Sequence, residues 1–224
     1  SYAPDIMIWP ETSVPFYFGY DHALSENLVN FQRSLNTYLL FGAVINRENP
    51  NNKRDDATDR IFTNSVVLLD KNGQTSYIYD KIHLVPFGEY VPLRNLLFFV
   101  DKLVYGVGDY SRGNSYIKAV TPFGSFGTLI CYEIVFPGLV RKFYRSGGDF
   151  IVTITNDAWF GQTGGPYQHF SMSVFRAIEN RKPILRAANT GISGVIDTKG
   201  RIQTSTRLFE KTFFVENIIT NNSL

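Results

Sequence analysis

Residues 125–156 read SFGTLICYEIVFPGLVRKFYRSGGDFIVTITN, and this stretch decides the fold class. Two apolar runs, Ser125–Ile130 and Phe150–Thr155, have the length and composition of buried strands. Between them, Pro137–Ser146 predicts a helix, because proline stands in its first turn and Gly147 follows its end. A strand, a helix and a second strand in this order indicate an α/β protein.

Outward from this stretch, the chain predicts short strands and hairpins with three more helices. The further helices are expected at residues 22–36, 94–105 and 166–181. Further strands are expected at residues 5–9, 38–45, 62–69, 74–79, 116–120, 184–188, 193–196, 201–205 and 213–219. Residues 46–60 are polar and predict an exposed loop. Many hairpins and few helices favour a mixed α/β sandwich over a purely parallel doubly wound sheet.

The first of those helices carries two specific expectations. Asp21 stands where a capping residue belongs, directly before the apolar repeat. The face expected to be buried shares helical spacing and consists of Leu24, Leu28, Phe31 and Leu35.

Composition limits the class of protein. The 224 residues suit one large domain or two small ones, and a net charge of +2 without a basic block argues against a nucleic-acid partner. A single cysteine excludes an intramolecular disulfide and a multi-cysteine metal cluster. No apolar run approaches the roughly 18 residues of a membrane span. The chain opens without Met directly before a predicted strand, so we expect it to be part of a longer protein.

Reactive side chains recur directly after predicted strands. Glu11 follows DIMIWP, Lys81 follows the strand that ends near Tyr79, and Cys131 follows GTLI. Asn156 and Asp157 follow FIVTIT in the same way. Because α/β folds gather ligands at strand ends, these side chains are candidates for one common site.

Each of these residues also has an ordinary interpretation. Cys131 could be a small buried apolar residue, or a nucleophile beside backbone N–H groups that stabilise an oxyanion. Glu11 could be a solvated carboxylate or a general base, and Lys81 a surface charge or a cation beside the oxyanion. A cysteine–histidine enzyme stays open on the residues alone, with His22, His83 and His169 as candidate bases.

Three separated motifs occur in order and resemble the nitrilase, or carbon–nitrogen hydrolase, superfamily. They are WPE at 9–11, KIHLVPFGEYVP at 81–92 and CYE at 131–133. NDAWFG at 156–161, GPYQH at 165–169 and RAANTGISGVID at 186–197 resemble one branch, the catalytic domain of the bacterial apolipoprotein N-acyltransferases. The resemblance covers essentially the whole chain. It implies a four-layer α-β-β-α sandwich and a Glu–Lys–Cys triad.

Carried over to this sequence, the resemblance implies a role for each matching residue. Glu11 corresponds to the general base, Lys81 to the oxyanion-stabilising lysine and Cys131 to the acyl-accepting nucleophile. The supporting residues are expected to be Glu89, Tyr132 and Glu133.

The implied reaction moves an acyl chain from a phospholipid through a thioester on Cys131 to the α-amine of a diacylglyceryl-cysteine lipoprotein. It needs no cofactor and no metal. The expected setting is the periplasmic face of the bacterial inner membrane, with the enzyme as a monomer. The branch has membrane helices on both sides of this region and the superfamily has an opening strand that would precede Ser1, so we expect residues 1–224 to be a fragment of a membrane protein. The alternative is a soluble amidase that hydrolyses a small C–N substrate.

Aromatic residues make up 15% of the chain, and the implied reaction suggests a use for them. Three apolar segments follow the predicted catalytic strand ends, at 15–18, 96–100 and 159–160. They could form a rim that admits acyl chains and touches a bilayer. The residues expected on this rim are Phe16, Phe18, Leu97, Phe98, Phe99, Trp159 and Phe160.

Overall fold

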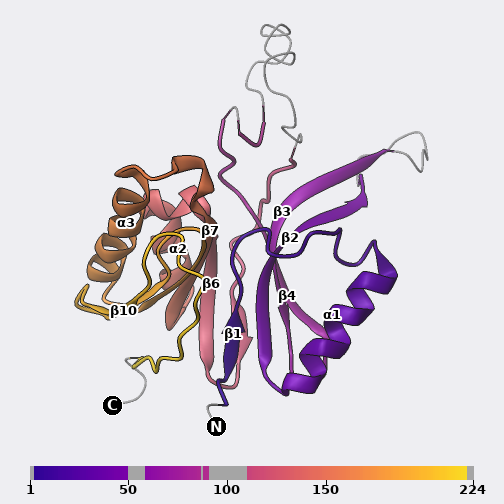
Figure 1. Ribbon diagram of the computed structural model, residues 1–224, viewed down its shortest axis with the longest axis horizontal. Coiled ribbons are helices and arrows are strands. Elements are labelled where there is room, and N and C mark those ends of the chain that lie inside the picture. The colour runs from indigo at the N-terminus through magenta and orange to yellow at the C-terminus, as the bar shows by residue number, and fades with distance from the viewer. Residues whose placement is uncertain (1–2, 50–58, 87, 91–109, 221–224) are drawn as a thin grey trace, which may run out of the picture.

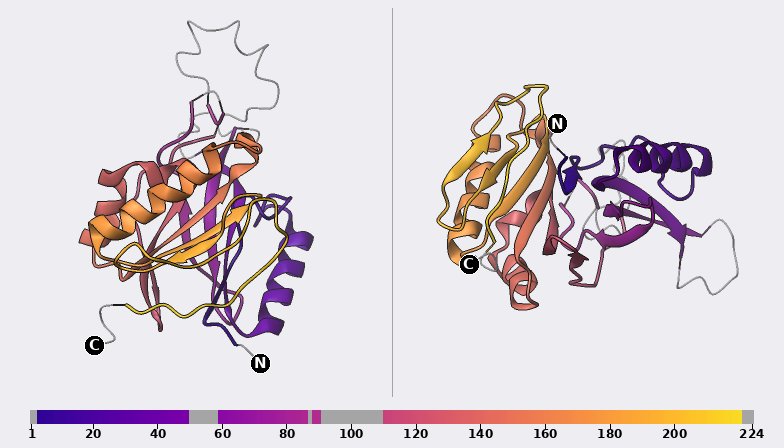
Figure 2. Two further views of the ribbon diagram at one scale, coloured as in Figure 1. Left: turned by 60° about the vertical axis from the view of Figure 1, so that its left-hand side comes forward. Right: turned by 90° about the horizontal axis from the view of Figure 1, so that it is seen from below.

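The computed structural model describes residues 3–49, 59–86, 88–90 and 110–220. These residues form two sheets packed face to face, and helices cover the outer face of each sheet (Figure 1). The order of layers is helix, sheet, sheet, helix, which confirms the predicted α-β-β-α sandwich. The view from below in Figure 2 separates the two halves, each consisting of one sheet and its helices.

The first half contains four strands in the order β1-β2-β3-β4. They span Ile6–Ile8, Tyr38–Glu48, Arg60–Leu69 and Thr75–Asp80. β1 runs parallel to β2, and the other pairs are antiparallel. Helix α1 (His22–Leu35) lies on the outer face. The predicted hairpin between β3 and β4 is confirmed.

The second half contains six strands in the order β10-β9-β8-β7-β6-β5, and β6, β7 and β8 at its centre are parallel. In chain order the strands are Ala119–Thr121, Gly124–Ile130, Phe150–Asn156, Ile184–Asn189, Gly194–Ile196 and Ile202–Ser205. Helices α2 (Pro137–Arg145) and α3 (Gly165–Asn180) cover this half. Two 3-10 helices that the sequence did not predict, η2 (Cys131–Val135) and η3 (Asp157–Phe160), follow β6 and β7.

The core follows from the alternation of side chains along the strands. Leu40, Val66 and Leu68 point toward the second sheet, where they join a large apolar cluster with residues such as Leu129 and Ile130. Their neighbours Leu39, Phe41, Val67 and Leu69 belong to a second cluster on the α1 side. Since successive residues of a strand face opposite ways, both faces of the first sheet are buried, and its strands are apolar along most of their length.

Four sequence predictions differ from the structure, and two of them concern α1. The α1 face is rotated: Leu24 and Phe31 are 50% and 47% exposed, whereas Ser25 and Gln32 are buried. Gln32 is buried in place of an apolar residue because its amide donates to the carbonyl oxygens of Thr37 and Asp70. At the start of α1, the Asp21 carboxylate accepts from the backbone N–H of Tyr17 and makes no bond to the helix.

Residues 213–219 form no strand, although their composition suggested one. The edge of the second sheet is β10, which pairs with β9, and the tail carries exposed Phe213 and Ile219. The polar loop predicted at 46–60 is shorter at both ends, because β2 continues to Glu48 and β3 begins at Arg60. The predicted helix at 94–105 lies outside the described residues.

Candidate active site

Four strands from both halves end on the same side of the sandwich. β1, β4, β6 and β7 all rise toward the upper side of Figure 1, while both chain ends lie at the lower side. The segments after these strands carry the reactive residues. Lys81 and Cys131 directly follow β4 and β6, and Glu11 comes shortly after β1. The predicted convergence at strand ends is therefore what the fold produces.

The first half supplies a buried cluster of two carboxylates and one lysine. The Lys81 Nζ lies 2.9 Å from the carboxylate of Glu89 and 3.6 Å from Oε1 of Glu11. The Asn64 amide donates to both carboxylates, at 2.8 Å in each case. The other oxygen of Glu11 accepts from the backbone N–H of Asn156, at the end of β7 in the second half. Every charged group is thus held at a fixed place.

Burial opposes the charge of Lys81, but its surroundings reverse that effect. The negative charge of Glu11, that of the Cys131 sulfur when it is ionised, and that of Glu89 raise the pKa of Lys81 above its ordinary value. The lysine is therefore a permanent cation at neutral pH. Because the cluster also contains two carboxylates, one lysine does not neutralise it fully.

Cys131 begins η2 with its backbone in the left-handed region, at a φ of +53°. Such a conformation costs a residue with a side chain about 1–2 kcal/mol, so the surrounding structure must hold it there. Burial, followed by the charge of Glu11, raises the pKa of the Cys131 thiol to about 12, and Lys81 and the Thr155 hydroxyl counteract part of this shift. The thiol is thus protonated at rest and needs a base at the moment of attack.

Glu133 joins the two halves close to the lysine and the cysteine. One oxygen accepts from the backbone N–H groups of Ile82 and His83, and the other from that of Ile130, at 2.8–3.0 Å. The hydroxyl of Tyr79 donates to the same carboxylate. Burial raises the pKa of Glu133 to about 7 despite these bonds. This side chain fixes the residues after Lys81 against the strand that leads to the cysteine.

A second charged cluster lies in the second half, where Asp157, His169 and Arg186 are all buried. The Asp157 carboxylate contacts His169 Nδ1 at 2.9 Å and Arg186 Nη2 at 2.8 Å. Burial opposes the charge of Asp157, but the hydrogen bond from His169 and the charge of Arg186 hold its pKa below the ordinary value. His169 Nε2 lies 3.1 Å from the backbone carbonyl oxygen of Cys131.

The three histidines are separated by the fold. His22 is exposed at the start of α1, and His83 is exposed and stacks on Phe136 at 4.4 Å between ring centres. His169 is buried near Cys131, but it contacts the backbone carbonyl oxygen of the cysteine. This geometry favours Glu11 over a histidine as the group that takes the thiol proton.

The residues expected on an apolar rim fall into three groups. Phe18 is buried and packs edge-on against Phe41 at 5.1 Å, and Phe16 packs against the same cluster, so this pair belongs to the core. Trp159 in η3 is 82% exposed, and Phe160 is half-buried beside His169. The remaining residues, Leu97, Phe98 and Phe99, lie outside the described residues. Tyr132 and Phe136 of the cysteine segment add two exposed rings that contact each other.

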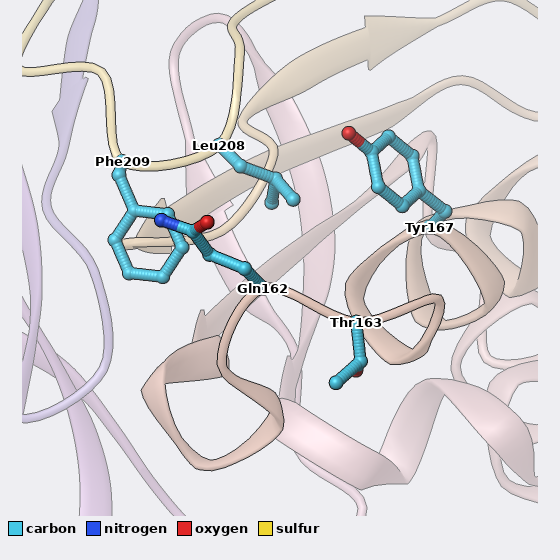
Figure 3. A pocket seen from close by; sticks show the side chains of 5 residues that line it. All are labelled: Gln162, Thr163, Tyr167, Leu208 and Phe209. Carbon is cyan, nitrogen blue, oxygen red and sulfur yellow. The ribbon is translucent and has the colours of Figure 1, made fainter.

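A small open cavity lies beside the start of α3 (Figure 3). Its volume is about 330 Å³. The side chains around it are Gln162, Thr163, Tyr167, Leu208 and Phe209. None of the predicted catalytic residues lines it, so the triad chemistry does not depend on this cavity.

Some functional positions were not recognised from the sequence. Asn64 stands between Thr63 and Ser65 in β3, and this polar interruption before the apolar run at Val66–Leu69 was the available signal. Asp157, His169 and Arg186 lay in quoted motifs, but nothing in the sequence indicated that they contact one another. Among the described residues, no group of three or more His, Cys, Asp or Glu side chains is placed to hold a metal ion. No helix in that part of the chain is long and apolar enough to cross a bilayer.

Comparison of the sequence with known proteins identifies a family and several related enzymes. The family model for carbon–nitrogen hydrolases matches residues 1–220. Apolipoprotein N-acyltransferase from Geobacter metallireducens is 45% identical over 207 residues, which cover 92% of this chain and 38% of that protein. The enzyme of the same name from Agrobacterium fabrum is 41% identical over 203 residues, covering 89% and 37%. The chain therefore spans less than half the length of these curated relatives.

Solved structures share the fold at low sequence identity. A carbon–nitrogen hydrolase from Helicobacter pylori has a TM-score of 0.67 and 14% identity, covering 92% of this chain and 75% of that one. An amidase from Nesterenkonia has a TM-score of 0.64 and 17% identity, covering 91% and 73%. In that structure the acetamide moiety of fluoroacetamide is covalently added at the active-site cysteine.

Proposed function

The chain belongs to the carbon–nitrogen hydrolase family, and from that premise we propose that it is the catalytic part of a membrane-bound N-acyltransferase. The acyl donor is a phospholipid, and the acceptor is the free α-amine of a diacylglyceryl-cysteine lipoprotein. The relatives named apolipoprotein N-acyltransferase support this reaction, because they match most of this chain at about 40% identity or more. The reaction takes place at the periplasmic face of a bacterial inner membrane.

In the first half-reaction Glu11 accepts the proton of the Cys131 thiol as the sulfur attacks the ester carbonyl carbon. A C–S bond forms, and the carbonyl oxygen becomes an oxyanion that Lys81 and the backbone N–H of Tyr132 stabilise. When the intermediate collapses, the ester C–O bond breaks. Glu11 returns its proton to the leaving alkoxide, so lysophospholipid departs and a thioester remains.

In the second half-reaction the acceptor amine attacks the thioester. Glu11 takes a proton from the amine while a C–N bond forms, and the C–S bond breaks to release the amide. The sulfur regains a proton from Glu11, which restores the resting site. One base therefore serves both steps, and each step balances without a further reactant.

The observation that carries this proposal is the buried ion cluster at the cysteine. Glu11 is held by Asn64 and the backbone of Asn156, and Lys81 is held by Glu89, so neither group needs to reorganise before it acts. A thiol whose pKa is raised to about 12 cannot supply a standing thiolate at neutral pH. The neighbouring carboxylate is therefore required in the attack itself.

A transferase must also keep water from the thioester, since water is present at roughly 55 M. The exposed rings of Tyr132, Phe136 and Trp159 lie in the segments after β6 and β7, close to the cysteine. These rings are suited to hold acyl chains and to exclude water. A soluble amidase that acts on a small amide has no need for such a surface.

The test uses the complete protein that contains this chain, purified in detergent and mixed with phospholipid. We expect an acyl-sized mass increase on the peptide that carries Cys131, and hydroxylamine should remove it. Added lipopeptide with a free α-amine should discharge the acyl-enzyme much faster than buffer does. Rapid hydrolysis that the amine does not accelerate would instead indicate a hydrolase.

A further inference from the structure

The catalytic side chains do not explain the unusual backbone conformation of the cysteine. Cys131 adopts a left-handed conformation, which residues other than glycine rarely adopt. The groups of the first half that act on the sulfur are Glu11 and Lys81, and their hydrogen bonds and ion pairs go to Asn64, Asn156, Glu89 and each other. Something else must hold the peptide that follows the cysteine.

His169 makes that contact. Its Nε2 lies 3.1 Å from the carbonyl oxygen of Cys131, and because a carbonyl only accepts, this nitrogen carries the hydrogen. The other ring nitrogen donates to the Asp157 carboxylate at 2.9 Å, and the same carboxylate accepts from Arg186 Nη2. The ring is therefore held at both ends and cannot turn without breaking buried hydrogen bonds.

The partners of His169 are themselves fixed by three different segments. Thr155, at the end of β7, donates to Asp157, and the Arg186 Nε donates to the carbonyl oxygen of Ile192. A Cβ atom at Gly191 would lie 2.2 Å from the Asp157 carboxylate, so only glycine leaves room for this arrangement. The cluster is a rigid support behind the nucleophile.

The orientation of one peptide group follows from this contact. In a planar trans peptide the C=O and the N–H point in opposite directions. Holding the Cys131 oxygen against His169 therefore directs the N–H of Tyr132 away from His169. That N–H lies in the first turn of η2, where a helix offers it no internal acceptor.

We infer that His169, fixed by Asp157 and Arg186, is a positioning residue that sets the oxyanion donor of the cysteine segment. It acts on the Cys131–Tyr132 peptide rather than on the sulfur. This inference rests on the proposed function, in which the Tyr132 N–H stabilises the oxyanion. His169 belongs to no catalytic triad in this scheme, and it does not take the thiol proton as a histidine base would.

Two reagents, applied to the complete protein, distinguish an effect of His169 on the oxyanion donor from an effect on the reactivity of the sulfur. Iodoacetamide alkylates Cys131 by displacement of iodide, and no oxyanion forms. An aliphatic aldehyde adds the thiol across its C=O bond to give a hemithioacetal, whose oxygen occupies the oxyanion position. The dissociation constant of the aldehyde is measured by the protection it gives Cys131 against alkylation.

His169→Ala should weaken aldehyde binding by about 10- to 100-fold, somewhat less than the loss of a whole oxyanion donor. The alkylation rate and its pH profile should stay within about 2-fold of the parent. His169→Gln keeps an N–H donor for the Cys131 oxygen and should recover most of the affinity. Gln32→Ala, which removes a buried donor far from the site, controls for a general loss of stability.

An alkylation rate that falls as far as the aldehyde affinity would overturn the inference, because His169 would then act on the thiol. Unchanged aldehyde affinity in His169→Ala would overturn it as well. If the alanine variant does not fold, His169→Asn against His169→Gln gives the same comparison, since the shorter amide cannot reach the carbonyl. Neither reagent needs phospholipid, so a parent protein that binds aldehyde but forms no acyl-enzyme would refute only the proposed function.

Discussion

The two halves of the sandwich each bring a buried charged cluster to the cysteine, but the clusters contact different parts of it. In the first half, Glu11 and Lys81 lie where they change the charge state of the thiol. In the second half, His169 contacts the backbone of the same residue, supported by Asp157 and Arg186. A reactive side chain and a suitable backbone around it are therefore separate requirements, and separate halves of one fold meet them here.

The largest expected effect comes from removing the sulfur on which both clusters act. Cys131→Ala should lower acyl transfer by about 10⁴-fold or more, because no thioester can form. Mass spectrometry of the Cys131 peptide and assay of lipopeptide acylation measure the effect. Acylation that persists in this variant would place the nucleophile elsewhere and would remove the basis of the comparison.

The next effect tests whether the cluster of the first half acts as a unit. Glu11→Gln and Lys81→Met should each reduce turnover by about 10³-fold or more, and the double variant should be little worse than either, because both groups serve one transition state. Single and double variants are compared by their rates of Cys131 acylation. Losses that multiply would indicate two independent contributions. Circular dichroism excludes unfolding as the cause, since either change leaves a buried charge with fewer partners.

A smaller effect concerns Glu133, the residue that joins the halves. Burial raises its pKa from the ordinary 4.5 to about 7, so the folded protein holds this proton more tightly than the unfolded chain. Its contribution to stability is therefore complete below about pH 4.5 and is lost as the pH rises to about 7. Since Glu133→Gln cannot titrate, the difference in unfolding free energy, parent minus variant, should fall by about 3 kcal/mol over this range.

Urea unfolding at a series of pH values measures that difference. Glu179→Gln, which changes a carboxylate at the exposed end of an ion pair, serves as the control for the loss of one carboxylate. A difference that does not change with pH for Glu133→Gln would mean that this buried carboxylate does not titrate as the structure implies.

The smallest effect on activity is expected for an exposed side chain that contacts neither charged cluster. Trp159→Ser should change the free energy of unfolding by less than about 0.5 kcal/mol, because the side chain is 82% exposed. It should still lower acylation from phospholipid vesicles by roughly 3- to 10-fold relative to a short water-soluble ester. Phe213→Ser, at a ring that is 88% exposed on the tail, is the matched control. Equal losses on both substrates would show that Trp159 does not contact acyl chains.

How much the sequence could predict differs between the fold and the site. The strand–helix–strand stretch, the hairpin and the positions of Glu11, Lys81 and Cys131 after strands depend on local patterns, which the sequence contains. The strand predicted at 213–219 is absent because a strand forms only where its backbone pairs with a neighbouring strand, and local composition does not determine that pairing. The buried face of α1 was misassigned because Gln32 satisfies two backbone carbonyls that only the folded chain brings near it.

Within the site, the unpredicted part consists of contacts between distant segments. Asn64 bridges two carboxylates from different loops, and His169 reaches the carbonyl oxygen of a residue 38 positions before it. Residue types at strand ends indicate which chemistry is available. They do not indicate which side chain supports which backbone, because that depends on the register of the sheets.

The left-handed backbone at Cys131 affects how a lineage of such proteins can change over time. Glycine at this position relieves about 1–2 kcal/mol of strain, which offsets much of what the fold loses with the small thiol. A mutation that ends the chemistry therefore need not harm folding or abundance. Quality control inside the cell cannot remove such variants, so only selection on the product keeps the cysteine in place. Descendants freed from that selection should lose this residue early and keep the sandwich.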